Sequence, residues 1–190
     1  MLTGTQVIDG KTYLFSGGGS DKQKGEMYQS EWWIFTNSKG ETVKKYFNSK
    51  GVMATGKKTV DDKEYIFSDS GALLSKTLVT IKKKTYFVNK NGVVQKSKFV
   101  STGGNRYYFN KNGVMLKKAF ITSKKRKYYA DKTGALRKGW VNINGKIYYF
   151  SKKDTKKFKK FQMVTGKVKI DGTKYRFTKS GVLKPTKKNE

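Results

Sequence analysis

Lysine and tyrosine are the side chains in this sequence whose types and spacing could do chemistry. Lysines offer repeated positive charge, and aromatic rings offer faces on which cations and flat ligands pack. The two occur together in short phrases such as residues 142–150, where an Asn-Gly pair and a lysine precede two tyrosines and a phenylalanine. This pattern favours binding rather than catalysis.

Candidates for catalysis are few. The chain has no His and no Cys, which removes the commonest general base, disulfides and thiolate metal ligands. Asp61 and Asp62 could in principle act as an acid and base pair, but adjacent acids between apolar segments are typical turn formers. The Gly-rich segment 16–20 lacks the Lys-Ser/Thr of a phosphate loop. We therefore expect no enzyme activity, no cofactor and no metal.

The net charge predicts a polyanionic partner. Lys and Arg number 43 against 13 Asp and Glu, giving +30, and all but four of the basic residues are Lys. Solubility of a small domain needs only about 2 to 8 net charges. Because Lys acts as a hydrated point charge, such a surface favours attraction that does not depend on sequence.

A repeat organises these residues. An aromatic doublet recurs along the chain, and from position 45 to position 148 the step is 20 or 21 residues. Six residues after the first position (the first slot) of each doublet there is a glycine, except in the repeat of Tyr148, which has Asp154 there. The first slots are Tyr13, Lys45, Tyr65, Tyr86, Tyr107, Tyr128, Tyr148 and Tyr175.

Each repeat reads as a β-hairpin. Asn-Gly, Asp-Gly and Gly-Gly pairs stand before the doublets, which is typical of two-residue primed turns. They predict a short strand over 140–143, for example, followed by one over 146–150. Lys-Lys occupies two of these turns, at 82–83 and 124–125, and suits a primed turn poorly, so we expect another loop there.

A single hairpin cannot bury its apolar face, so neighbours must stack. We predict an all-β fold, a β-solenoid of stacked hairpins of about 21 residues with almost no helix. Residues 1–183 would form a single repeat domain of about seven to nine hairpins, with insertions near 16–40 and 151–163. Residues 184–190 would be a basic, frayed tail.

The repeats carry a family resemblance. Residues 139–150 (GWVNINGKIYYF) and 165–183 (TGKVKIDGTKYRFTKSGVL) closely resemble the cell-wall-binding repeats of Gram-positive bacteria. That superfamily includes choline-binding modules, glucan-binding repeats of glucansucrases and the receptor-binding regions of large clostridial toxins. The resemblance covers nearly the whole chain. It implies a non-catalytic hairpin solenoid, secreted and fused to a larger protein.

The sequence departs from the choline-binding pattern. Gly-Trp occurs once, at Gly139 and Trp140, whereas the equivalent slots hold Lys57, Leu78, Phe99, Phe120 and Lys167. The residue before the doublet is a cation in several repeats, and a cation beside an aromatic pocket would repel a quaternary ammonium group. We therefore expect choline not to be the ligand.

An anionic wall glycopolymer, such as teichoic or lipoteichoic acid, is the ligand that the charge favours. Many weak contacts in register add through multivalency, and salt should weaken them. The lysines predicted to bind it are Lys82, Lys83, Lys84, Lys124, Lys125, Lys127, Lys146, Lys156, Lys157, Lys159 and Lys160.

A neutral α-glucan is the alternative, with sugar rings stacked on exposed aromatic faces. The predicted platforms are Tyr86, Tyr107, Tyr128, Trp140, Tyr148 and Tyr175. Within a doublet the two side chains should point to opposite faces of the sheet, so that one is buried and the other exposed. No nucleic-acid-binding motif is present, so we expect no specific nucleic acid partner.

The cellular context is an expectation as well. The first residues lack a basic and apolar leader, and no apolar run approaches the roughly 18 residues of a membrane span. The sequence opens in mid-repeat, as expected for a segment of a longer protein with an added Met. We expect an extracellular location at the cell wall or cell surface.

Overall fold

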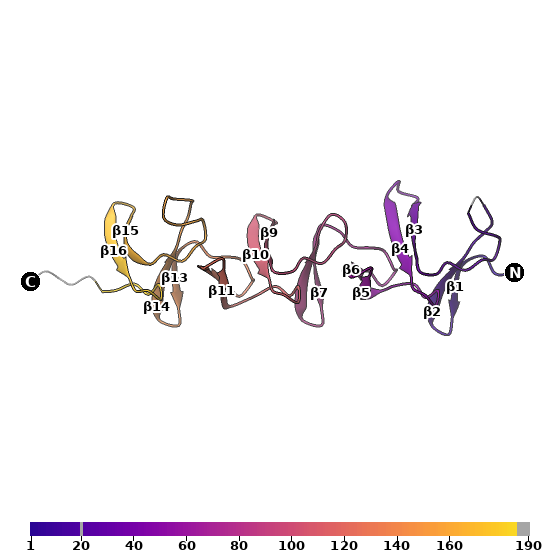
Figure 1. Cartoon of the computed structure of the whole chain (residues 1–190), viewed down its shortest axis with the longest axis horizontal. Coiled ribbons are helices and arrows are strands. Elements are labelled where there is room, and N and C mark those ends of the chain that lie inside the picture. The colour runs from indigo at the N-terminus through magenta and orange to yellow at the C-terminus, as the bar shows by residue number, and fades with distance from the viewer. Residues whose placement is uncertain (20, 186–190) are drawn as a thin grey trace, which may run out of the picture. The chain divides into compact units, whose positions relative to one another are not determined.

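The computed structural model describes residues 1–19 and 21–185, and within this range the chain forms sixteen β-strands and no helix. It divides into two compact units, Met1–Gln95 and Lys96–Glu190. The strands of each unit can be followed along the chain in Figure 1. The prediction of an all-β fold of repeated hairpins is confirmed. The predicted tail falls mostly on residues 186–190, which lie outside the described residues.

Every strand pairs with its immediate neighbour in the sequence, so each sheet is one antiparallel hairpin. The strands of the first unit are β1 Gly4–Ile8, β2 Lys11–Phe15, β3 Glu31–Thr36, β4 Thr42–Phe47, β5 Gly56–Val60, β6 Lys63–Phe67, β7 Thr77–Ile81 and β8 Lys84–Val88. Those of the second unit are β9 Lys98–Thr102, β10 Asn105–Phe109, β11 Ala119–Ser123, β12 Arg126–Ala130, β13 Gly139–Ile143, β14 Lys146–Phe150, β15 Gly166–Ile170 and β16 Thr173–Phe177.

The hairpin turns correct one prediction. Ile81 pairs with Lys84, which leaves Lys82 and Lys83 as a two-residue turn, and their φ angles are 46° and 65°. The Lys124–Lys125 turn is built alike, with φ of 47° and 60°. Positive φ at both central residues is the mark of a type I′ turn. The prediction of a different loop was wrong, because the pairing register of the hairpin outweighs the cost of left-handed backbone at lysine.

Backbone hydrogen bonds join successive repeats within each unit. The amide of Leu73, after the β5–β6 hairpin, donates to the carbonyl of Lys44 in the preceding hairpin at 2.8 Å. In the second unit Leu136 donates to Arg106 and Leu183 to Ile147 in the same way, both at 2.8 Å. Each repeat therefore uses its neighbour to satisfy backbone groups that a lone hairpin would leave to water.

The periodic glycines receive side chains from the preceding repeat. A Cβ atom on Gly71 would lie 2.8 Å from Cε of Met53, and one on Gly92 would lie 2.8 Å from Cγ of Leu73. Both glycines have a φ of +78°. Positive φ and close approach together explain why glycine recurs at this place.

Two repeats depart from this arrangement because a longer loop replaces the glycine turn. In the first, Gly25 rather than the aligned Gly19 receives the preceding side chain, that of Met1. In the second, Phe161 stands at the corresponding position with a φ of 67°. The loops run from Ser16 to Glu26 and from Ser151 to Gln162, within the segments predicted as insertions.

Candidate functional site

The aromatic residues gather into four triads. In each, one ring of a hairpin's first strand packs against its cross-strand partner and against a ring of the next hairpin. Trp140, for example, lies 4.9 Å from the ring centroids of both Tyr149 and Tyr175. The triads are Trp32/Tyr46/Tyr65, Phe99/Tyr108/Tyr128, Phe120/Tyr129/Tyr148 and Trp140/Tyr149/Tyr175.

The triads change the prediction of exposed platforms. Tyr86, Tyr128 and Tyr148 are buried, each at 9% exposure or less, so they offer no open ring face. Tyr107 and Tyr175 are half-buried, and Trp140 is 39% exposed. Phe120, which was not among the predicted platforms, is 44% exposed and lies at the same place in its hairpin as Trp140.

The expected split of each doublet into one buried and one exposed ring was wrong for Tyr148 and Tyr149. Both are buried, at 8% and 7%. Neighbouring segments cover both faces of the two-stranded sheet: Tyr148 packs on Phe120 of the preceding hairpin, whereas Tyr149 packs on Trp140 and joins a core cluster with Phe158. The strand alternation rule holds, but both faces are interior.

Protein cations already occupy some aromatic faces. The guanidinium carbon of Arg106 lies 5.0 Å from the centroid of Phe99, and Nζ of Lys57 lies 5.1 Å from that of Tyr86. Lys57 also forms an ion pair with Glu64 at 2.8 Å. At these two places the position where a quaternary ammonium ligand would make a cation–π contact is filled.

One tyrosine slot holds a lysine. Lys45 takes the first doublet position of β4, and its Nζ lies 6.0 Å from the ring of Trp33. Burial lowers the pKa of Lys45 from its ordinary value, because the partly dry site disfavours the charged form.

The predicted lysines are all exposed, and they lie on several different elements. Lys82 and Lys83 form the tip of the β7–β8 hairpin, and Lys124 and Lys125 the tip of β11–β12. Lys84, Lys127 and Lys146 lie on strands next to the turns, and Lys156, Lys157, Lys159 and Lys160 lie on the long loop after β14.

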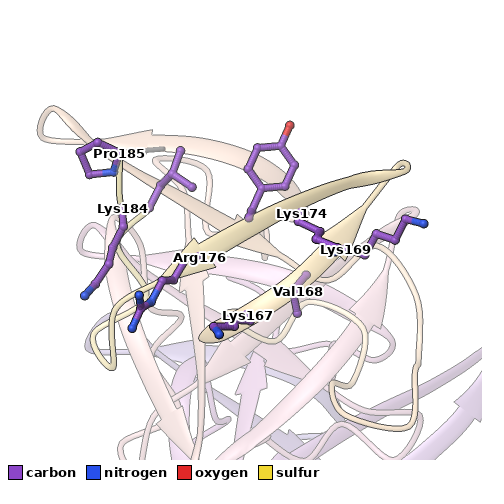
Figure 2. A pocket seen from close by; sticks show the side chains of 9 residues that line it. Lys167, Val168, Lys169, Lys174, Arg176, Lys184 and Pro185 are labelled. Carbon is purple, nitrogen blue, oxygen red and sulfur yellow. The ribbon is translucent and has the colours of Figure 1, made fainter. Parts of the chain in front are cut away.

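A basic groove lies on the β15–β16 hairpin, and of its lining residues the site prediction named only Tyr175. It has a volume of about 1070 Å³ (Figure 2). No acidic side chain lines it among the described residues. Its lining is Lys167, Val168, Lys169, Lys174, Tyr175, Arg176, Leu183, Lys184 and Pro185.

Like charges face one another across this hairpin. Lys167 is the direct cross-strand partner of Arg176, and Lys169 is that of Lys174. The backbone amide of Lys184 donates to the carbonyl of Arg176 at 2.8 Å, which holds Lys184 beside the hairpin. Its side chain is the fifth cation of the groove. Figure 2 shows Arg176 and Lys184 at the same end of the groove. Opposed like charges destabilise a hairpin, and an anion in the groove would relieve that repulsion.

A second groove, of about 580 Å³, lies between the β11–β12 and β13–β14 hairpins and contains both charges. Lys118, Lys132 and Arg137 line it together with Asp131. Burial acts to raise the pKa of Asp131, but hydrogen bonds from Thr133 and the charge of Arg137, 3.5 Å away, lower it overall. The carboxylate therefore stays charged and makes this groove less suited to anions than the first.

The acidic residues considered as an acid and base pair lie in a turn. Asp61 and Asp62 form a hairpin turn with φ of 46° and 59°, which agrees with their interpretation as turn formers. Within residues 1–19 and 21–185, no group of three or more His, Cys, Asp or Glu side chains could hold a metal ion. No helix suited to crossing a membrane occurs in that part of the chain.

Among solved structures, several proteins of Streptococcus pneumoniae share this fold. Choline binding protein F from Streptococcus pneumoniae superposes with a TM-score of 0.74 at 23% identity, over 97% of this chain and 58% of that one. The choline-binding domain of CbpL from the same organism gives 0.59 at 18% identity, covering 98% and 100%. CbpJ from Streptococcus pneumoniae TIGR4 gives 0.53 at 16% identity, covering 96% and 88%.

Family models match the second unit. Residues 99–138 match the choline-binding repeat, and residues 138–154 match the putative cell wall binding repeat. No curated protein sequence matches significantly. The resemblance noted in the sequence is confirmed by these models and by the shared fold. Residues 99–154 thus match cell-wall-binding repeats of the choline-binding type, and the chain as a whole shares the fold of choline binding protein F.

Proposed function

We propose that this module attaches a secreted bacterial protein to the cell envelope by binding an anionic glycopolymer of the teichoic or lipoteichoic acid type. The basic groove on β15–β16 is the observation that supports this most strongly. It combines five exposed cations with one half-buried tyrosine and has no lining acid in the described part of the chain. A phosphodiester backbone supplies the spaced negative charges that such a surface lacks.

Multivalency would provide the affinity. Each exposed lysine contributes about 1 kcal/mol or less. A polymer that contacts many of them gains from each further contact without the cost of a new association. The net charge of +30 then has a role that a neutral ligand would not give it.

A β-solenoid would present these lysines at regular intervals. Within each unit the amide after one hairpin bonds the hairpin before it, and Figure 1 shows the fourth hairpin pointing in the same direction as the first. Both features support winding with about three hairpins per turn.

The location and the parent protein are part of the proposal. Cell-wall attachment requires an extracellular module, and the chain spans 58% of the length of choline binding protein F. We infer fusion to a larger secreted protein whose activity lies elsewhere.

Exposed Trp140 and Phe120 favour a neutral α-glucan as the second candidate. Their ring faces are large enough to stack on a sugar ring. Choline stands in the names of choline binding protein F and of the choline-binding domain of CbpL, and it would compete for the same triads. Arg106 and Lys57 make choline the weaker candidate, because each puts a cation over an aromatic ring.

Co-sedimentation with purified Gram-positive cell walls tests the proposal. Walls are used before and after acid extraction of teichoic acids, beside insoluble α-glucan, at low and high salt and with free choline. Binding lost on extraction and in high salt supports the proposal. Salt-tolerant binding to glucan, or elution by choline at constant ionic strength, would overturn it in favour of the aromatic triads.

A further inference from the structure

The loop from Ser151 to Gln162 has a folded architecture that occurs twice in the chain. The amide of Ser151 donates to the carbonyl of Gln162 at 2.9 Å, and the amide of Phe161 donates back to Ser151 at 2.7 Å. In the first unit Ser16 bonds Glu26 at 2.8 Å and Gly25 bonds Ser16 at 2.7 Å.

The side chains that close the two loops correspond as well. The amide of Lys159 donates to Oε1 of Gln162 at 3.0 Å, and the amide of Gln23 donates to Oε2 of Glu26 at 3.0 Å. A glutamine thus does in the second loop what a glutamate does in the first. The two loops share a backbone arrangement and differ in charge.

The first loop is neutralised from within. Lys22 lies 3.1 Å from Glu26 and 3.0 Å from Glu31. The hydrogen bond and charge of Glu31, then those of Glu26, raise the pKa of Lys22. A hydrogen bond from the amide of Gln23, then Lys22, lowers the pKa of Glu26. Two lysines, Lys22 and Lys24, and two acids, Asp21 and Glu26, lie between residues 16 and 26, so this loop carries no net charge.

The second loop carries excess positive charge. Six exposed lysines and a single acid, Asp154, lie between Ser151 and Phe161. Lys159 approaches Asp154 at 3.7 Å, and Lys152 approaches Asp171 at 3.7 Å. The other four have no ion pair among the described residues, and they are Lys153, Lys156, Lys157 and Lys160.

Internal bonds hold these like charges together. Oδ1 of Asp154 accepts from the amide of Lys160 at 2.7 Å, and Oγ1 of Thr155 accepts from the amide of Phe158 at 2.9 Å. Phe158 is buried in the core with Ile170 and Phe177 of the β15–β16 hairpin. The loop is therefore anchored to the hairpin that bears the basic groove.

We propose that this loop, residues 151–162, is a preformed binding site for a linear phosphodiester polyanion. The inference rests on the proposed function and locates its strongest contact. The backbone of this loop is already ordered by its internal hydrogen bonds, so binding costs less conformational entropy here than on a segment that folds only when it binds. The polymer also relieves the mutual repulsion of the four unpaired lysines.

The experiment compares two variants with the same net charge. The loop variant replaces the four unpaired lysines by glutamine: Lys153→Gln, Lys156→Gln, Lys157→Gln and Lys160→Gln. The spread variant replaces four exposed lysines that occupy one equivalent turn position in four repeats: Lys90→Gln, Lys111→Gln, Lys132→Gln and Lys179→Gln. Circular dichroism and thermal unfolding check that both fold as the wild type does.

Synthetic poly(glycerol phosphate) is the probe, titrated over a range of salt concentrations. We expect the loop variant to bind at least roughly tenfold more weakly than the wild type at low salt. The slope of log affinity against log salt concentration should become shallower by about 3 units. We expect the spread variant to lose less than about threefold. Inorganic polyphosphate should give the same ranking, since the recognised chemistry is a chain of phosphates.

The outcomes separate this inference from the proposed function. If the wild type binds the polymer and both variants weaken equally, the array is diffuse and the loop is not a distinct site. If the wild type does not bind it, both proposals fail. If the loop variant loses only single-stranded DNA binding and keeps polymer binding, the loop is a nucleic acid contact and the inference is overturned.

Discussion

Met53 of one repeat fills the space in front of Gly71 in the next. The Cγ and Cε atoms of Met53 each lie 2.8 Å from the point where a Cβ on Gly71 would stand. The same relationship joins Met115 to Gly134 and Met163 to Gly181. The flexible methionine side chain of one repeat thus packs in the space that the glycine of the next repeat leaves open. This contact joins neighbouring repeats, as expected for a fold in which each hairpin depends on the one beside it.

Gly71→Ala should destabilise the first unit by about 2 to 4 kcal/mol, since it adds a steric clash to an unfavourable positive φ. Gly10→Ala is the matched control, because Gly10 has a φ of +69° with no atom within 4 Å of its Cβ position. It should cost only about 1 kcal/mol. Urea unfolding measures both, and equal losses would mean that Met53 moves aside freely.

The Lys82–Lys83 turn should be a site of easy stabilisation. Changing Lys82→Asn and Lys83→Gly should raise the free energy of unfolding by about 1 kcal/mol, because both residues have positive φ and Asn-Gly suits a type I′ turn. The reverse change in the β13–β14 hairpin, Asn144→Lys with Gly145→Lys, should lower it by a similar amount. A midpoint of thermal unfolding that rises in both variants, or falls in both, would contradict this.

Charge reversal on one hairpin tip should weaken polymer binding without unfolding the protein. Lys124→Glu, Lys125→Glu and Lys127→Glu alter three exposed residues of the β11–β12 hairpin. The affinity for teichoic-acid-bearing walls at low salt should fall roughly tenfold, because three weak contacts are lost. High salt should reduce the difference. Unchanged binding with an intact circular dichroism spectrum would show that this tip does not contact the polymer.

Trp140→Ala should separate the aromatic function from the ionic one. The side chain packs on Tyr149 and Tyr175, so truncation should cost about 1 to 3 kcal/mol of stability. It should leave polyanion affinity within about twofold, since no charge changes. Trp140→Phe keeps an aromatic ring and serves as the control. A large loss of wall binding in the Ala variant alone would favour stacking on sugar.

Asp154 should make the basic loop sensitive to acid. A hydrogen bond from the amide of Lys160, then the charges of Lys159 and Lys160, lowers the pKa of Asp154 from its ordinary value of 3.8. A carboxylate with a lowered folded pKa stabilises the fold above its ordinary pKa, and this contribution is lost as the pH falls through the lowered value. The loop should therefore loosen below about pH 3.8.

The Lys160 amide resonance, followed by NMR as a function of pH, reports this step. Its midpoint should lie below the ordinary aspartate pKa, and the titration should vanish in Asp154→Asn. That variant keeps an oxygen that can accept the amide hydrogen bond but cannot titrate. A midpoint at or above the ordinary value would show that the loop does not hold the carboxylate in its charged form.

The sequence by itself determined the hairpin repeat. Turn pairs such as Asn144–Gly145, and the aromatic doublets that follow them, can be read from a few adjacent residues. A two-residue turn of this kind sets the pairing register of the strands on both sides. The likeness to cell-wall-binding repeats was also recognisable from residues 139–150. Net charge alone indicated a polyanion, since long-range charge does not depend on which side chains touch.

Only the tertiary structure decided which side chains are exposed and which converge. The burial of Tyr148 and Tyr149 together depends on Phe120 of another hairpin and on Phe158 of a loop, and no local pattern encodes such contacts. The opposed pairs Lys167–Arg176 and Lys169–Lys174 arise from pairing register. The loops that begin at Ser16 and Ser151 share a pattern of backbone hydrogen bonds. Their sequences differ in length and charge, so the match could not be seen before the structure was known.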